Sequence, residues 1–258
     1  MTKDINFRIL DVKIDKITTI EVLEKIKGFL LLNDQHYIVT LNPEMIIEAQ
    51  ENTLFKSIIN KANLVIPDGT GVLLAYKYIY HKKLPEKITG IDLIEKICKE
   101  KYINDLKIYL LGAKEGIAKK TSEILCKKYP NLKIIGAEDG IKDFMSDNYK
   151  IENDKLIKKI NITKPGILFV AFGSPKQEIW ISKNIKKMPS VKLAIGVGGS
   201  FDFISGKIKR APKIFQRLGF EWLYRLFQEP KRIKRIYNAT IKFGWIIIKN
   251  KKGKIPVL

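Results

Sequence analysis

Asp68 is the residue of this chain whose type and position most directly indicate acid–base chemistry. It follows the apolar run "NLVIP", and glycines at positions 69 and 71 surround it. A carboxylate at a strand end, with small neighbours that leave room for a substrate, could take a proton from an attacking hydroxyl group. An aspartate at such a turn also commonly caps a helix or forms an Asx-turn. Position alone leaves these two interpretations about equal.

Four further apolar segments also end in small or polar residues. Glycines at such turns let a backbone approach a phosphate group, and the helix that follows offers N–H groups to it. For any one glycine, an ordinary turn is the favoured interpretation, but all the turns together favour a nucleotide-type ligand. The candidates are Thr40 and Asn42; Gly112; Gly173, Ser174 and Gln177; and Gly196, Gly198, Gly199, Ser200 and Asp202.

The sequence lacks the short motifs of the commonest nucleotide sites. The segment "GVGGSFD" departs from the dinucleotide pattern G-x-G-x-x-G, because Phe201 stands where the third glycine belongs. No P-loop motif and no D-x-D metal-binding pair occur. If the ligand is a nucleotide diphosphate, Lys and Arg side chains must therefore neutralise it.

Covalent catalysis and zinc binding are also disfavoured. His36 and His81 are isolated from the Gly-rich turns, and Cys98 and Cys126 lie in helix-like segments. These residues form neither a Ser/His or Cys/His pair nor a set of zinc ligands. We expect the two cysteines to be buried thiols.

The elements that must position these residues follow one another in a regular order. Apolar, strand-like runs alternate with segments of helical period, for example the strand-like "HYIVTLN" at 36–42 and a helix over 117–128. This alternation predicts an α/β, Rossmann-like fold with a mostly parallel sheet and helices on both faces. Ligands of such sheets collect beyond the carboxyl ends of the strands, which is where the polar turns lie.

The charge of the chain implies an anionic partner and indicates a boundary. The formal net charge is +21, and residues 207–258 carry 15 Lys and Arg residues against 2 Asp and Glu residues. We therefore divide the chain into an α/β domain, residues 1–205, and a basic helical appendage, residues 206–258. No RNP-like or zinc-finger signature supports nucleic-acid binding. The imperfect glycine pattern likewise disfavours a nicotinamide enzyme.

The appendage has the composition of a segment that contacts a lipid surface. The amino-terminal residues have no apolar signal core, and no apolar run approaches the ~20 residues of a spanning helix. We thus expect a cytoplasmic protein that associates peripherally with an anionic membrane. Within the appendage, we expect Trp222, Leu223 and Leu226 to pack in the core and the residues beyond about Lys231 to contact the membrane. The aromatic content is also compatible with a homo-oligomer. The membrane-facing side comprises Ile233, Ile236, Tyr237, Ile241 and Ile248, beside Lys231, Lys234 and Lys242.

An ordered set of motifs extends from about Phe7 to Arg235. It comprises "TLNPEMI", "IPDGTGV", "ITGIDL", "YLLGAKEG", "FGSPKQEIWI", "GVGGSFDFISGKIKRAPK" and "GFEWLYRLFQEPKRIKR". This set resembles the WecG/TagA/CpsF glycosyltransferases. The resemblance implies a metal-independent, inverting transferase that moves an N-acetylmannosamine-type sugar from UDP to polyprenyl-diphosphate-linked N-acetylglucosamine. In the TagA branch, the product is the linkage disaccharide of wall teichoic acid. Other relatives use the uronic acid of that sugar or glucose-type donors.

The resemblance also implies roles for individual residues. Asp68 is the expected base on the acceptor hydroxyl group. Thr40, Asn42 and Gln177 are expected in the sugar pocket, and Asp202 and the turns at Gly112, Gly173 and Gly199 at the nucleotide. Arg225, Arg232 and Arg235 match tail arginines that complete the site over the diphosphate, although Pro230 interrupts any helix that would join them.

Two positions depart from the family pattern. Lys87 stands where the family usually has an arginine before the "TG-D" motif, and lysine keeps the charge but lacks bidentate phosphate geometry. We still expect Lys87 to contact the substrate. Ile141 stands where the family often has a tyrosine, so Phe144 is the candidate for an aromatic platform under the base.

Overall fold

A computed structural model describes residues 7–103, 105–141 and 143–251 of the chain. The amino-terminal residues 1–6, which belong to the segment without an apolar signal core, lie outside the described residues. Within the described residues, none of the helices combines the length and the hydropathy of a membrane-spanning segment.

A six-stranded sheet forms the centre of the fold, in the order β4-β3-β8-β7-β5-β6. Strand β7 pairs in parallel with both β5 and β8, so that Ile167 lies opposite Ile108 and Leu193. This sheet confirms the predicted α/β class, and every predicted strand is present. The strands are β3 (His36–Leu41), β4 (Leu64–Pro67), β5 (Lys107–Gly112), β6 (Lys133–Glu138), β7 (Ile167–Ala171) and β8 (Leu193–Gly196).

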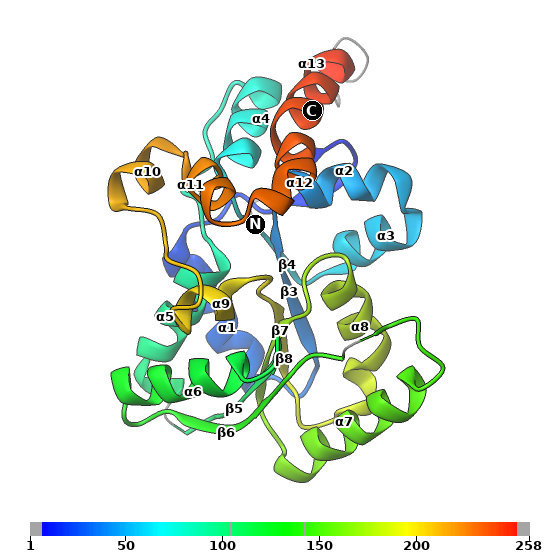
Figure 1. Cartoon of the computed structure of the whole chain (residues 1–258), viewed down its shortest axis with the longest axis vertical. Coiled ribbons are helices and arrows are strands. Elements are labelled where there is room, and N and C mark those ends of the chain that lie inside the picture. The colour runs from blue at the N-terminus through cyan, green and yellow to red at the C-terminus, as the bar shows by residue number, and fades with distance from the viewer. Residues whose placement is uncertain (1–6, 104, 142, 252–258) are drawn as a thin grey trace. The chain divides into compact units, whose positions relative to one another are not determined.

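Helices cover both faces of the strands β5 to β8, as predicted. Figure 1 shows α1, α5 and α6 on one side of these strands and α7 and α8 on the other. All five residues of β7 are buried, as expected for a parallel strand covered on both faces. The helices around this part of the sheet are α1 (Thr19–Leu31), α5 (Gly90–Lys99), α6 (Ile117–Lys128), α7 (Tyr149–Thr163), α8 (Lys176–Asn184) and α9 (Ser200–Ile204), with 3₁₀ turns at Lys101–Ile103 and Ile185–Lys187.

The chain folds into two compact units. The first unit comprises the described parts of residues 1–18, 40–89 and 209–258, and the second unit comprises residues 19–39 and 90–208. The carboxyl-terminal segment is thus grouped with residues 40–89. The division into a catalytic domain, residues 1–205, and an appendage, residues 206–258, stays a prediction.

The first unit contains a hairpin that the sequence analysis missed. Strands β1 (Phe7–Ile9) and β2 (Val12–Ile14) pair antiparallel across Leu10 and Asp11, whose φ angles are 50° and 63°. Two central residues with positive φ fit the two-residue turns that twist with their strands. The helices of this unit are α2 (Pro43–Glu51), α3 (Thr53–Lys61), α4 (Thr70–Tyr80), α10 (Lys213–Leu218), α11 (Glu221–Gln228), α12 (Ile233–Tyr237) and α13 (Phe243–Lys251).

The carboxyl-terminal segment breaks at Pro230, as expected. Helix α11 ends at Gln228, a 3₁₀ turn spans Pro230–Arg232, and α12 continues through a π-helical segment, Asn238–Lys242, into α13. Figure 1 shows α13 beside α4 and α2. On α13, Phe243 and Ile247 are buried. This part of the segment therefore has one face packed within the first unit.

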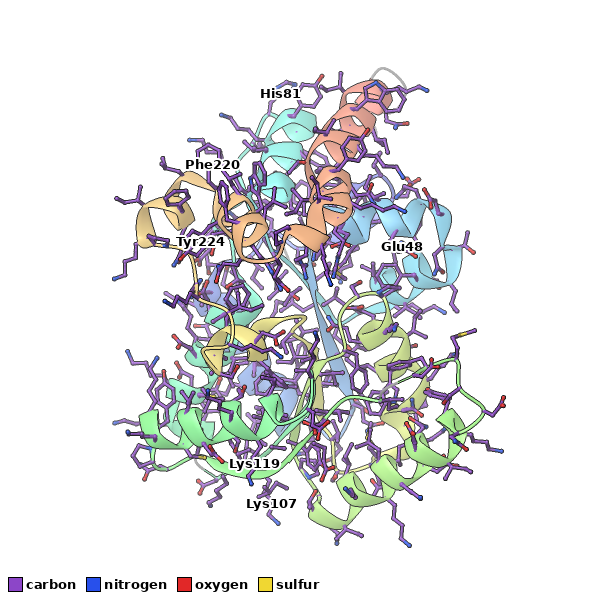
Figure 2. The ribbon with its side chains drawn as sticks, in the orientation of Figure 1. Glu48, His81, Lys107, Lys119, Phe220 and Tyr224 are labelled. Carbon is purple, nitrogen blue, oxygen red and sulfur yellow. The ribbon has the colours of Figure 1, made fainter. Side chains whose placement is uncertain are left out.

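The core packing expected for Trp222 is wrong. Its side chain is 38% exposed, and α11 contains no buried residue. Figure 2 shows the neighbouring Phe220 and Tyr224 on the same segment. Leu223 and Leu226 are half-buried, and Glu221 at the start of α11 pairs with Lys87. Of the cysteines, Cys98 is buried as expected and Cys126 is half-buried.

His36 predicts how stability depends on pH. Its ring is buried, stacks on Phe29 at a centroid distance of 4.2 Å, and has no hydrogen-bond partner among the described residues. Burial lowers the pKa of His36, against the charge of Asp34. The unfolded chain therefore binds this proton more readily, and the folded state loses stability as the pH falls through the unfolded pKa of about 6.5.

We expect the His36→Phe variant to lose less thermal stability than the parent between pH 7.5 and 5.5. Midpoints of thermal unfolding at several pH values would measure this difference. His81, which is exposed on the first unit (Figure 2), provides the control His81→Asn, because asparagine tolerates its left-handed backbone. Parallel pH profiles for His36→Phe and the parent would contradict the assignment.

Candidate active site

Asp68 lies where three segments of the first unit meet. It follows β4, and its backbone N–H donates to the Leu41 carbonyl oxygen at 2.7 Å. The Ile88 N–H donates to the Pro67 carbonyl oxygen at 2.9 Å. These two bonds fix the end of β4 between the end of β3 and the segment that carries Lys87. The Asp68 side chain is half-buried.

The turn after Asp68 explains the glycines that surround it. Gly69 occupies the N-cap position of α4 with a φ of 102°, and no side-chain hydrogen bond caps the helix. A Cβ atom on Gly71 would lie 2.7 Å from Pro43 Cγ. Position 69 therefore favours glycine because of its backbone conformation, and position 71 because the Pro43 ring approaches it closely. Gly69, and not Asp68, is the N-cap residue of α4, and the Asx-turn and general-base interpretations of Asp68 both stay predictions.

Thr40 and Asn42, expected in the sugar pocket, both lie at the end of β3. Thr40 is buried in the strand. The Asn42 side chain accepts a hydrogen bond from the Met45 N–H at 3.0 Å and caps α2. Asn42 therefore has a structural role of its own, and a substrate contact would use its amide nitrogen.

Lys87 forms an ion pair with Glu221, the first residue of α11. The other oxygen of the same carboxylate lies 3.8 Å from Arg210 Nε. Lys87 and Glu221 are both half-buried. The carboxyl-terminal segment is thus tied by charge to the segment that follows Asp68.

The structure brings the three predicted arginines together around two carboxylates. Arg225 Nε donates to Glu229 at 2.9 Å, and Arg232 Nε lies 3.8 Å from the same Glu229 oxygen. Arg235 donates two hydrogen bonds to the Glu44 carboxylate, of 2.6 and 2.9 Å. The break at Pro230 therefore does not separate the arginines, because Glu229 joins Arg225 and Arg232 across it.

The electrostatics of this cluster favour an anion. Burial and the charges of Arg225 and Arg235 lower the pKa of Arg232 to about 10, although Glu229 and Glu44 oppose the shift. Burial raises the pKa of Glu229, but the hydrogen bond from Arg225 and the charges of the arginines leave it lowered overall. Three cations thus outnumber two carboxylates, and the repulsion on Arg232 would be relieved by a bound phosphate group.

A cavity of about 230 Å³ lies in the second unit, at the carboxyl ends of β5, β6 and β7. The predicted residue Asp202 lines the cavity. Gly112 directly precedes the lining residue Ala113, and Gly173 directly follows the lining residue Phe172. Gly112 has a φ of 117°, and a Cβ atom there would lie 2.7 Å from the Ala171 carbonyl carbon. Gly199 is the N-cap residue of α9, the helix that carries Asp202. The lining residues are Ala113, Lys114, Gly140, Ile141, Phe144, Ala171, Phe172, Lys176 and Asp202.

Two aromatic rings and two lysines give the cavity its chemical character. Phe144 and Phe172 meet edge to face at a centroid distance of 5.2 Å, and Lys176 Nζ lies 5.2 Å from the Phe144 ring. Lys114 lines the same space. An aromatic ring beside two cations suits a planar base that carries phosphate groups.

Gln177, expected in the sugar pocket, is 1% exposed and bonded within the second unit. Its Oε1 atom accepts from the Gly198 N–H at 2.9 Å, and its Nε2 atom donates to Glu178 at 2.7 Å. Gln177 is thus a component of the turn after β8, and a role in binding sugar stays a prediction.

The sequence analysis did not identify the two carboxylates that pair with the three arginines. Glu229 lies four residues after Arg225 and three before Arg232, and this helical spacing could have indicated it. Glu44 gives no such signal, because Arg235 follows it 191 residues later. Among the described residues, no group of three His, Cys, Asp or Glu side chains could hold a metal ion.

Comparisons with known proteins match nearly the whole chain. The profile of the "Glycosyl transferase WecG/TagA/CpsF family" matches residues 7–255. A relative from Staphylococcus aureus strain MRSA252, named N-acetylglucosaminyldiphosphoundecaprenol N-acetyl-beta-D-mannosaminyltransferase, is 35% identical over 95% of this chain and 92% of its own length. Relatives of the same name from strains MW2 and NCTC 8325 are 34% identical over the same shares.

Proposed function

The chain belongs to the WecG/TagA/CpsF family of glycosyltransferases, and we propose that it transfers N-acetylmannosamine from UDP to undecaprenyl-diphosphate-linked N-acetylglucosamine. The product is the linkage disaccharide of wall teichoic acid. The observation that carries this proposal is the similarity over 95% of the chain to relatives named for this transfer.

The proposed reaction inverts the anomeric centre in a single displacement. The acceptor hydroxyl oxygen attacks the anomeric carbon, its proton passes to the Asp68 carboxylate, and the bond to the UDP oxygen breaks. The electron pair of that bond leaves with UDP, so negative charge grows on the diphosphate. The cluster of Arg225, Arg232 and Arg235 supplies positive charge for such a group, and we therefore assign no step to a metal ion.

Donor identity is tested by the mass of the lipid product. A short-chain prenyl-diphosphate-N-acetylglucosamine acceptor is incubated with UDP-N-acetylmannosamine, with its uronic acid analogue and with UDP-glucose. We expect an acceptor extended by one N-acetylhexosamine with the first donor alone. Extension only by the uronic acid or by glucose would assign the chain to another cell-surface polysaccharide of the family.

The cavity of the second unit is the proposed nucleotide site. Phe144 presents its ring to the base, in the role that the tyrosine of the family pattern would have, and Lys114 and Lys176 supply cations. Stacking of a base on an aromatic ring is worth about 1–3 kcal/mol, so Phe144→Ala should weaken UDP binding about fivefold or more. Calorimetric titration with UDP measures this change.

The control for this prediction is Met145→Ala. Met145 follows Phe144 in the chain, is 91% exposed and is not a lining residue of the cavity. We expect this variant to bind UDP as the parent does. Equal affinities for all three proteins would refute the assignment of Phe144.

The carboxyl-terminal segment is the proposed contact with the inner face of the cell membrane. Exposed apolar side chains recur at helical intervals along it, at Ile233, Tyr237, Ile241, Trp245 and Ile248. This row is called the apolar stripe below. Exposed lysines flank it, which suits anionic headgroups. Ile236, which was expected on this face, is half-buried.

We expect the double variant Ile241→Glu/Trp245→Glu to associate with anionic vesicles at least about tenfold more weakly than the parent, because burying each side chain is worth about 1.5–3 kcal/mol. Cosedimentation with vesicles that contain phosphatidylglycerol measures the association. Leu54→Glu, at an exposed position on α3 outside the stripe, is the control. If the double variant cosediments with the vesicles as the parent does, the apolar stripe does not contact the membrane.

A further inference from the structure

Glu178 is a buried carboxyl group that the proposed reaction does not use. It lies in the first turn of α8, is 1% exposed, and its Oε2 atom has no hydrogen-bond partner among the described residues. Its Oε1 atom accepts from Gln177 Nε2 at 2.7 Å. A carboxyl group loses much hydration when it is buried, and the bond from Gln177 replaces part of that hydration.

The bond from Gln177 decides which way the Gln177 amide points. The Gly198 N–H can donate only to the amide oxygen, at 2.9 Å, so the amide nitrogen must find an acceptor on its other side. Glu178 is that acceptor. Reversal of the amide would place an NH₂ group against the Gly198 N–H and an oxygen against the ionised Glu178 carboxylate, and both contacts would be repulsive.

The absence of a side chain at Gly196 leaves room for Gln177 and Glu178. A Cβ atom on Gly196 would lie 2.7 Å from Gln177 Nε2 and 3.1 Å from Glu178 Oε1. The Val197 N–H donates to the Val170 carbonyl oxygen at 2.9 Å, which holds the beginning of the turn against β7. The bond from Gly198 to Gln177 then holds its second half, which leads into α9 and Asp202.

We propose that Glu178 is a positioning residue that, through the Gln177 amide, fixes the turn at 196–199 and so places Asp202 at the nucleotide cavity. The cavity and Gln177 lie in the same unit. Asp202 lines the cavity and lies on the helix that directly follows this turn. The proposal rests on the proposed function in one respect, namely that UDP occupies this cavity. Its structural part, the ordering of the Gly198 N–H, does not depend on any ligand.

The protonation state of Glu178 suggests the conservative variant. Burial raises the pKa of Glu178 to about 7, against the lowering effect of the hydrogen bond from Gln177. A neutral carboxyl group keeps a carbonyl oxygen that can accept from Gln177. Glu178→Gln offers the same oxygen without the charge, whereas Glu178→Ala leaves the Gln177 amide without an acceptor on that side.

Four variants and two measurements test the proposal. The Kd for UDP is measured by calorimetry, and the exchange rate of the Gly198 amide proton by NMR without ligand. Loss of a buried acceptor costs about 1–3 kcal/mol, so we expect Glu178→Ala to raise the Kd about tenfold and to speed Gly198 exchange by a similar factor. Glu178→Gln should stay within about twofold of the parent in both measurements. Gly196→Ala, which pushes the pair aside without altering it, should behave as Glu178→Ala does.

The matched control is Asn153→Ala. Asn153, on α7, is also buried and polar, and its side-chain oxygen accepts at 2.7 Å from Nε1 of Trp180, which lies on α8 with Glu178. It should lower the unfolding temperature and leave the UDP Kd and Gly198 exchange unchanged. Parent-like values in both measurements for Glu178→Ala and Gly196→Ala would overturn the proposal, as would rapid Gly198 exchange in the parent. If the parent itself fails to bind UDP while the Gly198 results hold, the proposed function fails and the positioning role stands.

Discussion

The Asp68→Asn variant should lose turnover by about two to four orders of magnitude, the range that a positioned general base contributes. Asparagine keeps the size of the side chain but cannot accept the proton of the acceptor hydroxyl group. The position is fixed by backbone bonds on both sides, from Asp68 to Leu41 and from Ile88 to Pro67, so the variant should fold normally. Initial rates of UDP release with a soluble acceptor analogue measure kcat, and calorimetry should show an unchanged Kd for UDP.

Asp11→Asn is the matched control for this result. Asp11 lies in the hairpin turn of the same unit with a φ of 63°, a conformation that asparagine tolerates. We expect parent-like turnover from it. If the Asp68→Asn variant is folded and has the turnover of the parent, Asp68 is not the general base.

Arg232→Ala should lower kcat by about two to three orders of magnitude, comparable to removal of one donor that stabilises a developing anion. Burial, together with the charges of Arg225 and Arg235, lowers the pKa of Arg232 to about 10. A leaving diphosphate gains negative charge in the transition state, so the loss should appear more in kcat than in KM. Arg232→Lys should recover part of the rate, because it restores the charge but not the bidentate geometry.

Lys242→Ala removes one positive charge from the same segment at a different place. Lys242 pairs with Glu51 at 3.1 Å, apart from the Arg225, Arg232 and Arg235 set. With a soluble acceptor, this variant should keep the parent rate. If Lys242→Ala and Arg232→Ala lose activity equally, general charge and not the arginine cluster supports the reaction.

The sequence predicted the parts of the fold that depend on local pattern. Buried parallel strands read as continuous apolar runs, so β5, β7 and β8 were evident, and the helix expected over 117–128 has the observed bounds. The hairpin was missed because its strands have three residues each and its turn uses Leu10 and Asp11, neither of which is a glycine. Trp222 was misassigned because the side chains of α11 are only partly covered, and helical period does not predict how completely a helix face is covered.

The candidate site was predictable in its residue types and not in its partners. Asp68 and the arginines were found because strand ends and basic segments are visible in a sequence. The Arg235–Glu44 pair joins residues far apart in the chain, and the Gln177–Glu178–Gly198 arrangement depends on how β8 meets α8. Such contacts come from tertiary packing, which one sequence does not encode in any short pattern.

On the proposed function, this chain couples release of UDP to sugar transfer onto a lipid-linked acceptor. The most direct test is the rate of UDP release from UDP-N-acetylmannosamine with and without a prenyl-diphosphate-N-acetylglucosamine acceptor. We expect release that depends on the acceptor and matches the formation of disaccharide lipid mole for mole. UDP release at the same rate without acceptor, or no release with it, would contradict the account.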